Sequence, residues 1–169
     1  MPGKSSSLGR SLAEGAVAGT AATAVMTAWM WAASHAGLMP EQPQRRIVRA
    51  TLLPGNADRR KPGDGLVGQL AHFGFGASMG AVFGLLSARR RPSVLAGVVY
   101  GLGVWAVSYE GWIGAAGILP PAHADRPDRR VSMLVAHLPY GATLAFTLRR
   151  MRPAAPLPAA EGETTASAS

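Results

Sequence analysis

The sequence lacks cysteine and has few charged residues, and each shortage excludes some kinds of protein. Without cysteine there is no disulfide framework and no thiolate metal site. Charged residues make up 15% of the chain, against about 25% in soluble domains, so a soluble protein is not expected. The sequence also has no phosphate-binding loop, dinucleotide fingerprint or nucleophile elbow. We therefore expect a protein that is not an enzyme.

The apolar residues gather in four runs, each long enough to cross about 30 Å of hydrocarbon as a helix. Helices so long and so apolar on all sides are rare in soluble proteins. The sequence thus predicts an all-α, four-helix transmembrane bundle over residues 12–150, with spans at about 13–38, 65–88, 93–119 and 131–149. Residues 1–11 form a polar lead, and residues 153–169 a disordered, low-complexity tail. The alternative for the first run is a signal peptide with Lys4 and Arg10 as its basic region.

The net charge of +8 comes from basic residues that flank the apolar runs, which favours the lipid bilayer over nucleic acid as partner. The basic residues divide almost equally between the two sides of the membrane. The clusters at 89–91 and 149–152 directly abut their spans and favour cytoplasmic termini. Residues 44–53, QRRIVRATLL, are either a surface helix with Arg45, Arg46 and Arg49 facing lipid headgroups, or an irregular basic loop.

Two pairs of short segments resemble each other and predict an internal repeat. Residues 72–79 read HFGFGASM and residues 137–144 read HLPYGATL. The first and third runs end alike, with GLMP at 37–40 and GILP at 117–120. Residues 12–88 and 93–150 would then be two helical hairpins in parallel orientation.

Small residues at four-residue spacing predict where the helices touch, as in a glycine zipper, because membrane helices associate through close packing of small side chains. The predicted packing positions are Gly68, Gly76, Gly80, Gly84, Gly114 and Gly141.

Glu110 is the only charged residue of the third run, and its depth matches that of two histidines. At 1.5 Å per residue, His72, His137 and Glu110 lie roughly 9–13 Å from the same membrane face. Ionisable groups at such depth usually face the bundle interior in pairs. The candidate polar site is therefore His72, Glu110 and His137, with Tyr140 and Gln69 on the same helix faces. His123 and Asp125 are interpreted as solvated loop residues.

Several roles remain open for this polar site. The first is a structural clamp that sets helix register, through hydrogen bonds of about 0.6–2 kcal/mol. The second is a proton-titrating site, since imidazole titrates near neutral pH. Two histidines and a carboxylate also suit zinc or iron, although no pair has the spacing of a metal motif, and the two histidines could ligate haem. The sequence names no cofactor.

The segments HFGFGASMGAVFG, GVVYGLGVW and HLPYGAT resemble the YagU-like family of small bacterial inner-membrane proteins. The resemblance covers about Gly15–Arg150 and implies a multi-pass helical bundle in the bacterial inner (plasma) membrane. It implies no activity. We therefore expect a structural or assembly role. The alternative is a small transporter, or a proton- or metal-responsive protein, that uses the His/Glu cluster as a homo-oligomer.

If the cluster titrates, Glu110→Gln will change how stability depends on pH. The wild type in detergent should show a pH-dependent shift in melting temperature that the variant lacks, because glutamine at position 110 has no proton to exchange. Identical pH profiles for the two proteins would rule out a titrating Glu110.

Overall fold

The computed structural model describes residues 3–38, 41–53, 55–88, 90–120 and 124–152. Within these ranges the chain is all-helical, as predicted, with no strand. The elements are α1 (Gly3–His35), α2 (Pro43–Thr51), α3 (Asp64–Leu86), α4 (Val94–Ala106), the π-helical segment η1 (Val107–Ile113) and α5 (Pro127–Met151). The tail at 153–169, like His123, lies outside the described residues.

Four helices are long and apolar enough to cross a membrane: Ser7–His35, Asp64–Leu86, Val94–Ile113 and Pro127–Met151. Their outer faces carry large exposed apolar side chains such as Leu70, Leu95 and Val99. A soluble monomer rarely exposes so much contiguous apolar surface, whereas lipid accepts it. The predicted transmembrane bundle is therefore confirmed.

The third span ends earlier than the predicted residue 119. The helix widens into η1 and kinks at Gly111, where ψ is −114°. It then closes at Gly117, whose φ of 66° lies in the left-handed region that glycine adopts without strain. The remaining residues up to 120 lie beyond the helix.

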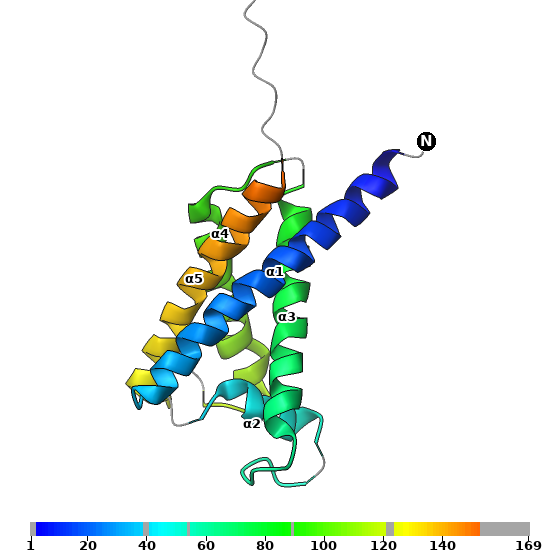
Figure 1. Cartoon of the computed structure of the whole chain (residues 1–169). Coiled ribbons are helices and arrows are strands. Elements are labelled where there is room, and N and C mark those ends of the chain that lie inside the picture. The colour runs from blue at the N-terminus through cyan, green and yellow to red at the C-terminus, as the bar shows by residue number, and fades with distance from the viewer. Residues whose placement is uncertain (1–2, 39–40, 54, 89, 121–123, 153–169) are drawn as a thin grey trace, which may run out of the picture.

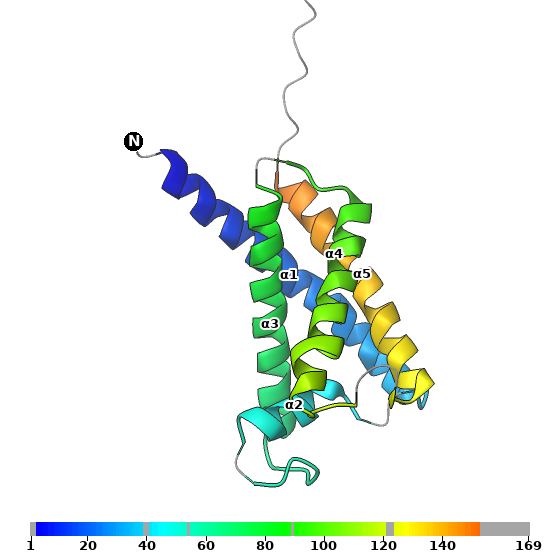
Figure 2. The same ribbon diagram turned by 180° about the vertical axis from the view of Figure 1, so that it is seen from behind.

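In Figure 1, α1 runs diagonally across α3 and α5, and Figure 2 shows α4 on the opposite side of the bundle. The contact between α1 and α3 is made by backbone against backbone. A Cβ atom added at Gly15, Gly19, Gly80 or Gly84 would collide with main-chain atoms of the other helix, and one at Gly76 would collide with the Thr23 hydroxyl.

The contact between α4 and α5 is equally close, with Gly97 and Gly101 against Gly141. Of the other predicted packing positions, Gly68 lies against the backbone of α2 at Gln44 and Arg45, and Gly114 caps η1.

The ends of α1 and η1 have the same hydrogen-bond pattern. Leu38 N donates to Ala33 O, and Gly37 N donates to Ser34 O. Likewise Ile118 N donates to Ile113 O, and Gly117 N donates to Gly114 O. Both are Schellman ends, in which a left-handed glycine lets two amides reach back to the last turn. Gly37 and Gly117 therefore stop their helices in the same way.

The buried Arg152 joins three helices at the end of the bundle that holds the last turn of α5. Its guanidinium donates to the carbonyls of Gly84 (3.0 Å), Ser87 (2.7 Å) and Arg90 (2.9 Å) at the end of α3, and to Glu14 of α1 (3.1 Å). The last carbonyls of a helix have no partner within it, so a cation that binds them is favourable.

Gly80→Ala should destabilise the bundle by about 1–3 kcal/mol, because the new methyl group would push α1 away from α3. Gly74→Ala is the matched control on the same helix, since nothing lies within 4 Å of its added Cβ. Unfolding in detergent, followed by circular dichroism, measures both. Equal stability of the two variants would contradict this account of the contact.

Candidate functional site

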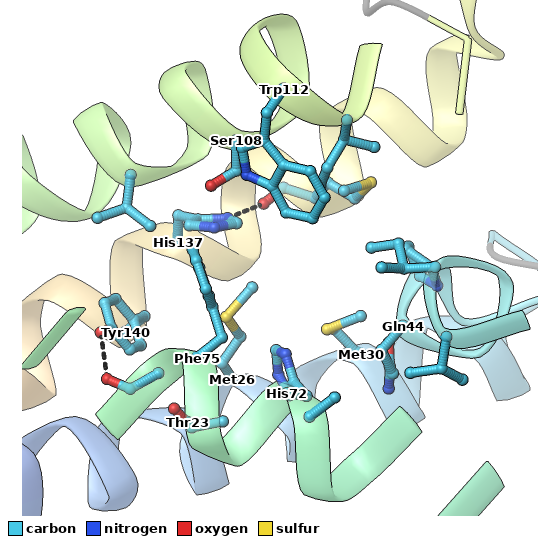
Figure 3. A pocket seen from close by; sticks show the side chains of 18 residues that line it. Thr23, Met26, Met30, Gln44, His72, Phe75, Ser108, Trp112, His137 and Tyr140 are labelled. Atoms are coloured by element: carbon cyan, nitrogen blue, oxygen red, sulfur yellow. Dashed lines mark hydrogen bonds between the residues drawn. The ribbon is translucent and has the colours of Figure 1, made fainter. Parts of the chain in front are cut away.

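A cavity of about 290 Å³ lies inside the bundle, near the end closed by α2 (Figure 3). Every element contributes to its wall. Most of the wall is apolar, and includes Met26, Met30, Ile47, Val48, Ile113 and Met133. The polar side chains in the wall are Thr23, Gln44, His72, Ser108, His137 and Tyr140.

Three residues of the predicted polar site, His72, His137 and Tyr140, line this cavity. His137 Nδ1 lies 2.7 Å from Met133 O, one turn earlier on α5. The Tyr140 hydroxyl donates to Gly76 O at 3.0 Å and ties α5 to α3. Both polar groups thus have a main-chain partner. Such partners matter because a polar atom buried among apolar groups has no water to bond.

His72 differs, because its buried Nε2 has no hydrogen-bond partner in the structure. Gln69, the fourth predicted residue, does not line the cavity and instead contacts α2 through Gln44 (3.1 Å). Glu110 lies on η1. Its side chain is outside the described part of the structure, so its predicted contact with the histidines stays a prediction.

Gln44, on α2, is a site residue that sequence reasoning missed. Its side-chain nitrogen donates to Gln42 Oε1 (2.7 Å) and Gln69 Oε1 (3.1 Å). With the amide in this orientation, Gln44 Oε1 is buried without a partner. The residue is 6% exposed and lines the cavity. No sequence motif marks it, because its role depends on how α2 docks.

α2 is held in place by Arg49, which only the surface-helix alternative for residues 44–53 had placed against lipid headgroups. Arg49 is 2% exposed and donates to Glu41 (2.8 and 2.9 Å), Asp64 (2.8 Å) and Ala57 O (2.7 Å). Burying the guanidinium removes it from water, which costs free energy. The two carboxylates offset that cost. The hydrogen bonds that Arg49 donates to Glu41 hold the pKa of Glu41 below its usual value and raise the pKa of Arg49.

Asp125 is likewise buried, which corrects the prediction of a solvated loop residue. It accepts hydrogen bonds from the Tyr109 hydroxyl, from Arg129 Nε (2.7 Å) and from Arg126 N (2.7 Å). Burial by itself would raise the pKa of Asp125, but the bonds from Arg129 and Tyr109 outweigh it and lower that pKa. This cluster joins η1 to the start of α5 and so positions two walls of the cavity.

The cavity meets the outer surface between α3 and η1. Phe75 and Trp112 both line it, yet they are 38% and 46% exposed. Farther along, large side chains hold α3 and α4 apart: the rings of Phe83 and Tyr100 stack at 4.7 Å, and the Tyr100 hydroxyl donates to Met79 O (2.7 Å). Phe75 and Trp112 both lie on helices that are long and apolar enough to cross a membrane.

The described residues include no group of three or more His, Asp or Glu side chains that could hold a metal ion. Glu110, whose side chain lies outside the described part of the structure, is not in that set.

The model of a family of unknown function, DUF6789, matches residues 9–158. The chain belongs to this family. No curated protein and no solved structure matches the chain significantly. Membership of DUF6789 agrees with the prediction that the family has no known activity. The resemblance to the YagU-like family stays a prediction.

The ion pairs at Arg49 predict acid sensitivity. Because the folded-state pKa of Glu41 is lowered, its contribution is present above the usual glutamate pKa, about 4.3, and is lost as the pH falls through the folded value. Glu41→Gln should cost about 1.5–3 kcal/mol at pH 7, the range for hydrogen bonds to charged groups. The difference from wild type should shrink in acid.

Asp58→Asn is the matched control, since Asp58 pairs with Arg46 in an exposed position (3.0 Å). Exposed ion pairs contribute about 0–1 kcal/mol. The stability of the wild type, Glu41→Gln and Asp58→Asn is measured by thermal unfolding in detergent from pH 7 to pH 3. A Glu41→Gln cost that does not change with pH would contradict the prediction.

Proposed function

We propose that the protein is a non-enzymatic, multi-pass protein of the bacterial inner membrane that binds a small, mostly apolar molecule in the cavity beside α2. The cavity itself carries this proposal. Its volume of about 290 Å³ is roughly twice that of an apolar cavity of about 150 Å³ that binds benzene. It also falls near the lower end of known ligand pockets, about 300 Å³.

An empty cavity of this size is costly. At about 24 cal/mol per Å³, a closed void of 290 Å³ would cost of order 7 kcal/mol. That cost compares with the whole stability of a typical domain, about 5–15 kcal/mol. The opening beside Phe75 and Trp112 reduces the cost, and it also gives lipid-soluble molecules a way in.

A structural or assembly role is the simpler alternative, and the bond from Tyr140 to Gly76 supports it as a polar clamp. A clamp needs no cavity, however, so binding accounts for more of the site. Release of the molecule to the other side would make the protein a transporter. Four spans would then function as a homo-oligomer, with His72 and His137 as the groups that respond to protons or metal.

We also propose that the two halves of the chain are structural repeats with cytoplasmic termini. Gly19 lies against Gly76 as Gly97 lies against Gly141, and Gly37 ends its helix as Gly117 does. Gly19 and its counterpart Gly97 are 78 positions apart, whereas Gly37 and its counterpart Gly117 are 80 positions apart. The second half therefore holds two more residues between these points. The wider turn of η1 takes up extra residues there.

The binding proposal predicts saturable quenching of Trp112 by 1-bromodecane. The protein would keep Trp112 as its only tryptophan and be measured in lipid vesicles. Ala71→Phe, which fills the cavity from α3, should abolish the saturable part. Val104→Phe should do the same from α4. Ala106→Phe is the control, because Ala106 is exposed and does not line the cavity.

A variant that keeps only Trp31, which is exposed away from the cavity, reports quenching from bulk lipid. Quenching there should rise with bromodecane without saturating. Binding to the cavity is refuted if Trp112 behaves like Trp31, or if both filling variants fold and still show saturation.

A further inference from the structure

Two buried polar atoms in the cavity wall have no hydrogen-bond partner, Gln44 Oε1 and His72 Nε2. Each loses hydrogen bonds to water on burial and regains none, at a cost of about 1–3 kcal/mol. Elsewhere in the site, the polar groups of His137 and Tyr140 do find main-chain partners. Both atoms are covered by neighbouring groups, so a polar ligand gains these hydrogen bonds when the Gln44 and His72 side chains turn toward the cavity.

The side chains that carry the two atoms are connected through Gln69 of α3. The Gln44 amide touches Gln69 on α3 at 3.1 Å. Gln69 and His72 are three residues apart on that helix, and side chains at this spacing are neighbours on one face. In Figure 3, His72 and Gln44 lie on the side of the cavity toward α2, away from Tyr140. One polar group of a ligand can therefore lie close to both.

The chemistry of this pair is specific. Gln44 Oε1 only accepts, and in the structure the amide nitrogen already donates to Gln42 and Gln69. His72 Nε2 accepts or donates, depending on its tautomer. A hydroxyl group satisfies both atoms, since it donates one hydrogen bond and accepts others. An ether oxygen has no proton to donate and leaves Gln44 Oε1 unpaired.

From these contacts we infer that the cavity binds an amphiphilic alcohol, whose hydroxyl donates to Gln44 Oε1 and meets His72 Nε2. This inference rests on the proposed binding function and specifies its ligand. By proportion with a benzene-binding cavity of about 150 Å³, the volume of about 290 Å³ suits an apolar body of roughly twelve heavy atoms. That body lies against Met26, Met30 and Met133, whose flexible side chains adapt to its shape.

The test compares 10-bromodecan-1-ol with 1-bromo-10-methoxydecane, using the protein with Trp112 alone. The alcohol should bind about tenfold more tightly than the ether, the factor expected for about 1.4 kcal/mol of hydrogen bonding. Gln44→Met and His72→Phe keep the approximate size of each side chain but remove the polar atom. Each should reduce the alcohol's advantage to about twofold or less.

Gln69→Met is the matched control. It removes the same hydrogen bond between α2 and α3 that Gln44→Met removes, but it lies outside the cavity and leaves Gln44 Oε1 in place. The tenfold preference should therefore persist in this variant. Its persistence also shows that loss of preference in Gln44→Met does not come from weakened docking of α2.

The outcomes separate this inference from the proposed function. If 1-bromodecane and both probes fail to show saturable quenching, cavity binding is wrong and the inference falls with it. If they bind but the alcohol and the ether bind equally, only the hydroxyl inference is overturned, as it would be if water satisfied both polar atoms. Equal loss of preference in Gln69→Met and Gln44→Met would also overturn it.

Discussion

The rest of the bundle depends on the close approach of α1 to α3. Glycine on both helices lets the two backbones touch, with Gly15 and Gly19 against Gly80 and Gly84. In lipid no hydrophobic drive pulls helices together, so this contact must come from shape. It sets the tilt at which α1 crosses both α3 and α5 (Figure 1), and α4 then reaches the bundle by packing on α5. α3 and α4 are left apart, with room for the cavity between them.

At each end of the bundle, one arginine bonds other parts of the protein instead of facing lipid headgroups. Arg49 lies between the first two spans and Arg152 directly follows the last one, yet both are buried. Arg49 neutralises two carboxylates and fastens α2 under the cavity, whereas Arg152 binds the last carbonyls of α3. Each links segments distant in the sequence, so each contributes to the arrangement of the helices as well as to their position in the membrane.

The features that the sequence predicted are those that depend on local pattern. Run length and apolar composition predicted the four spans, and four-residue spacing predicted Gly76, Gly80, Gly84 and Gly141 as contact positions. Matched depths pointed to His72 and His137, which line one cavity, although their relation to Glu110 is still a prediction.

The features that escaped prediction depend on partners far away in the chain. Arg49 appears from its neighbours to be a surface cation, and only the return of the chain to Asp64 gives it a buried partner. Asp125 becomes buried because η1 brings Tyr109 to it. Gln44 joins the cavity because Arg49 docks α2. Hydropathy and spacing carry no information about such pairings, since they describe each segment alone.

The position of Arg152 has a consequence for biosynthesis. Its partners on α1 and α3 leave the ribosome long before it does, because Arg152 follows the last span. Until then the carbonyls at the end of α3 and the Glu14 carboxylate wait without their final partner. The contact can close only when all four spans have been inserted. A chain that ends before Arg152 therefore lacks the contact that joins α1, α3 and α5 at this end of the bundle.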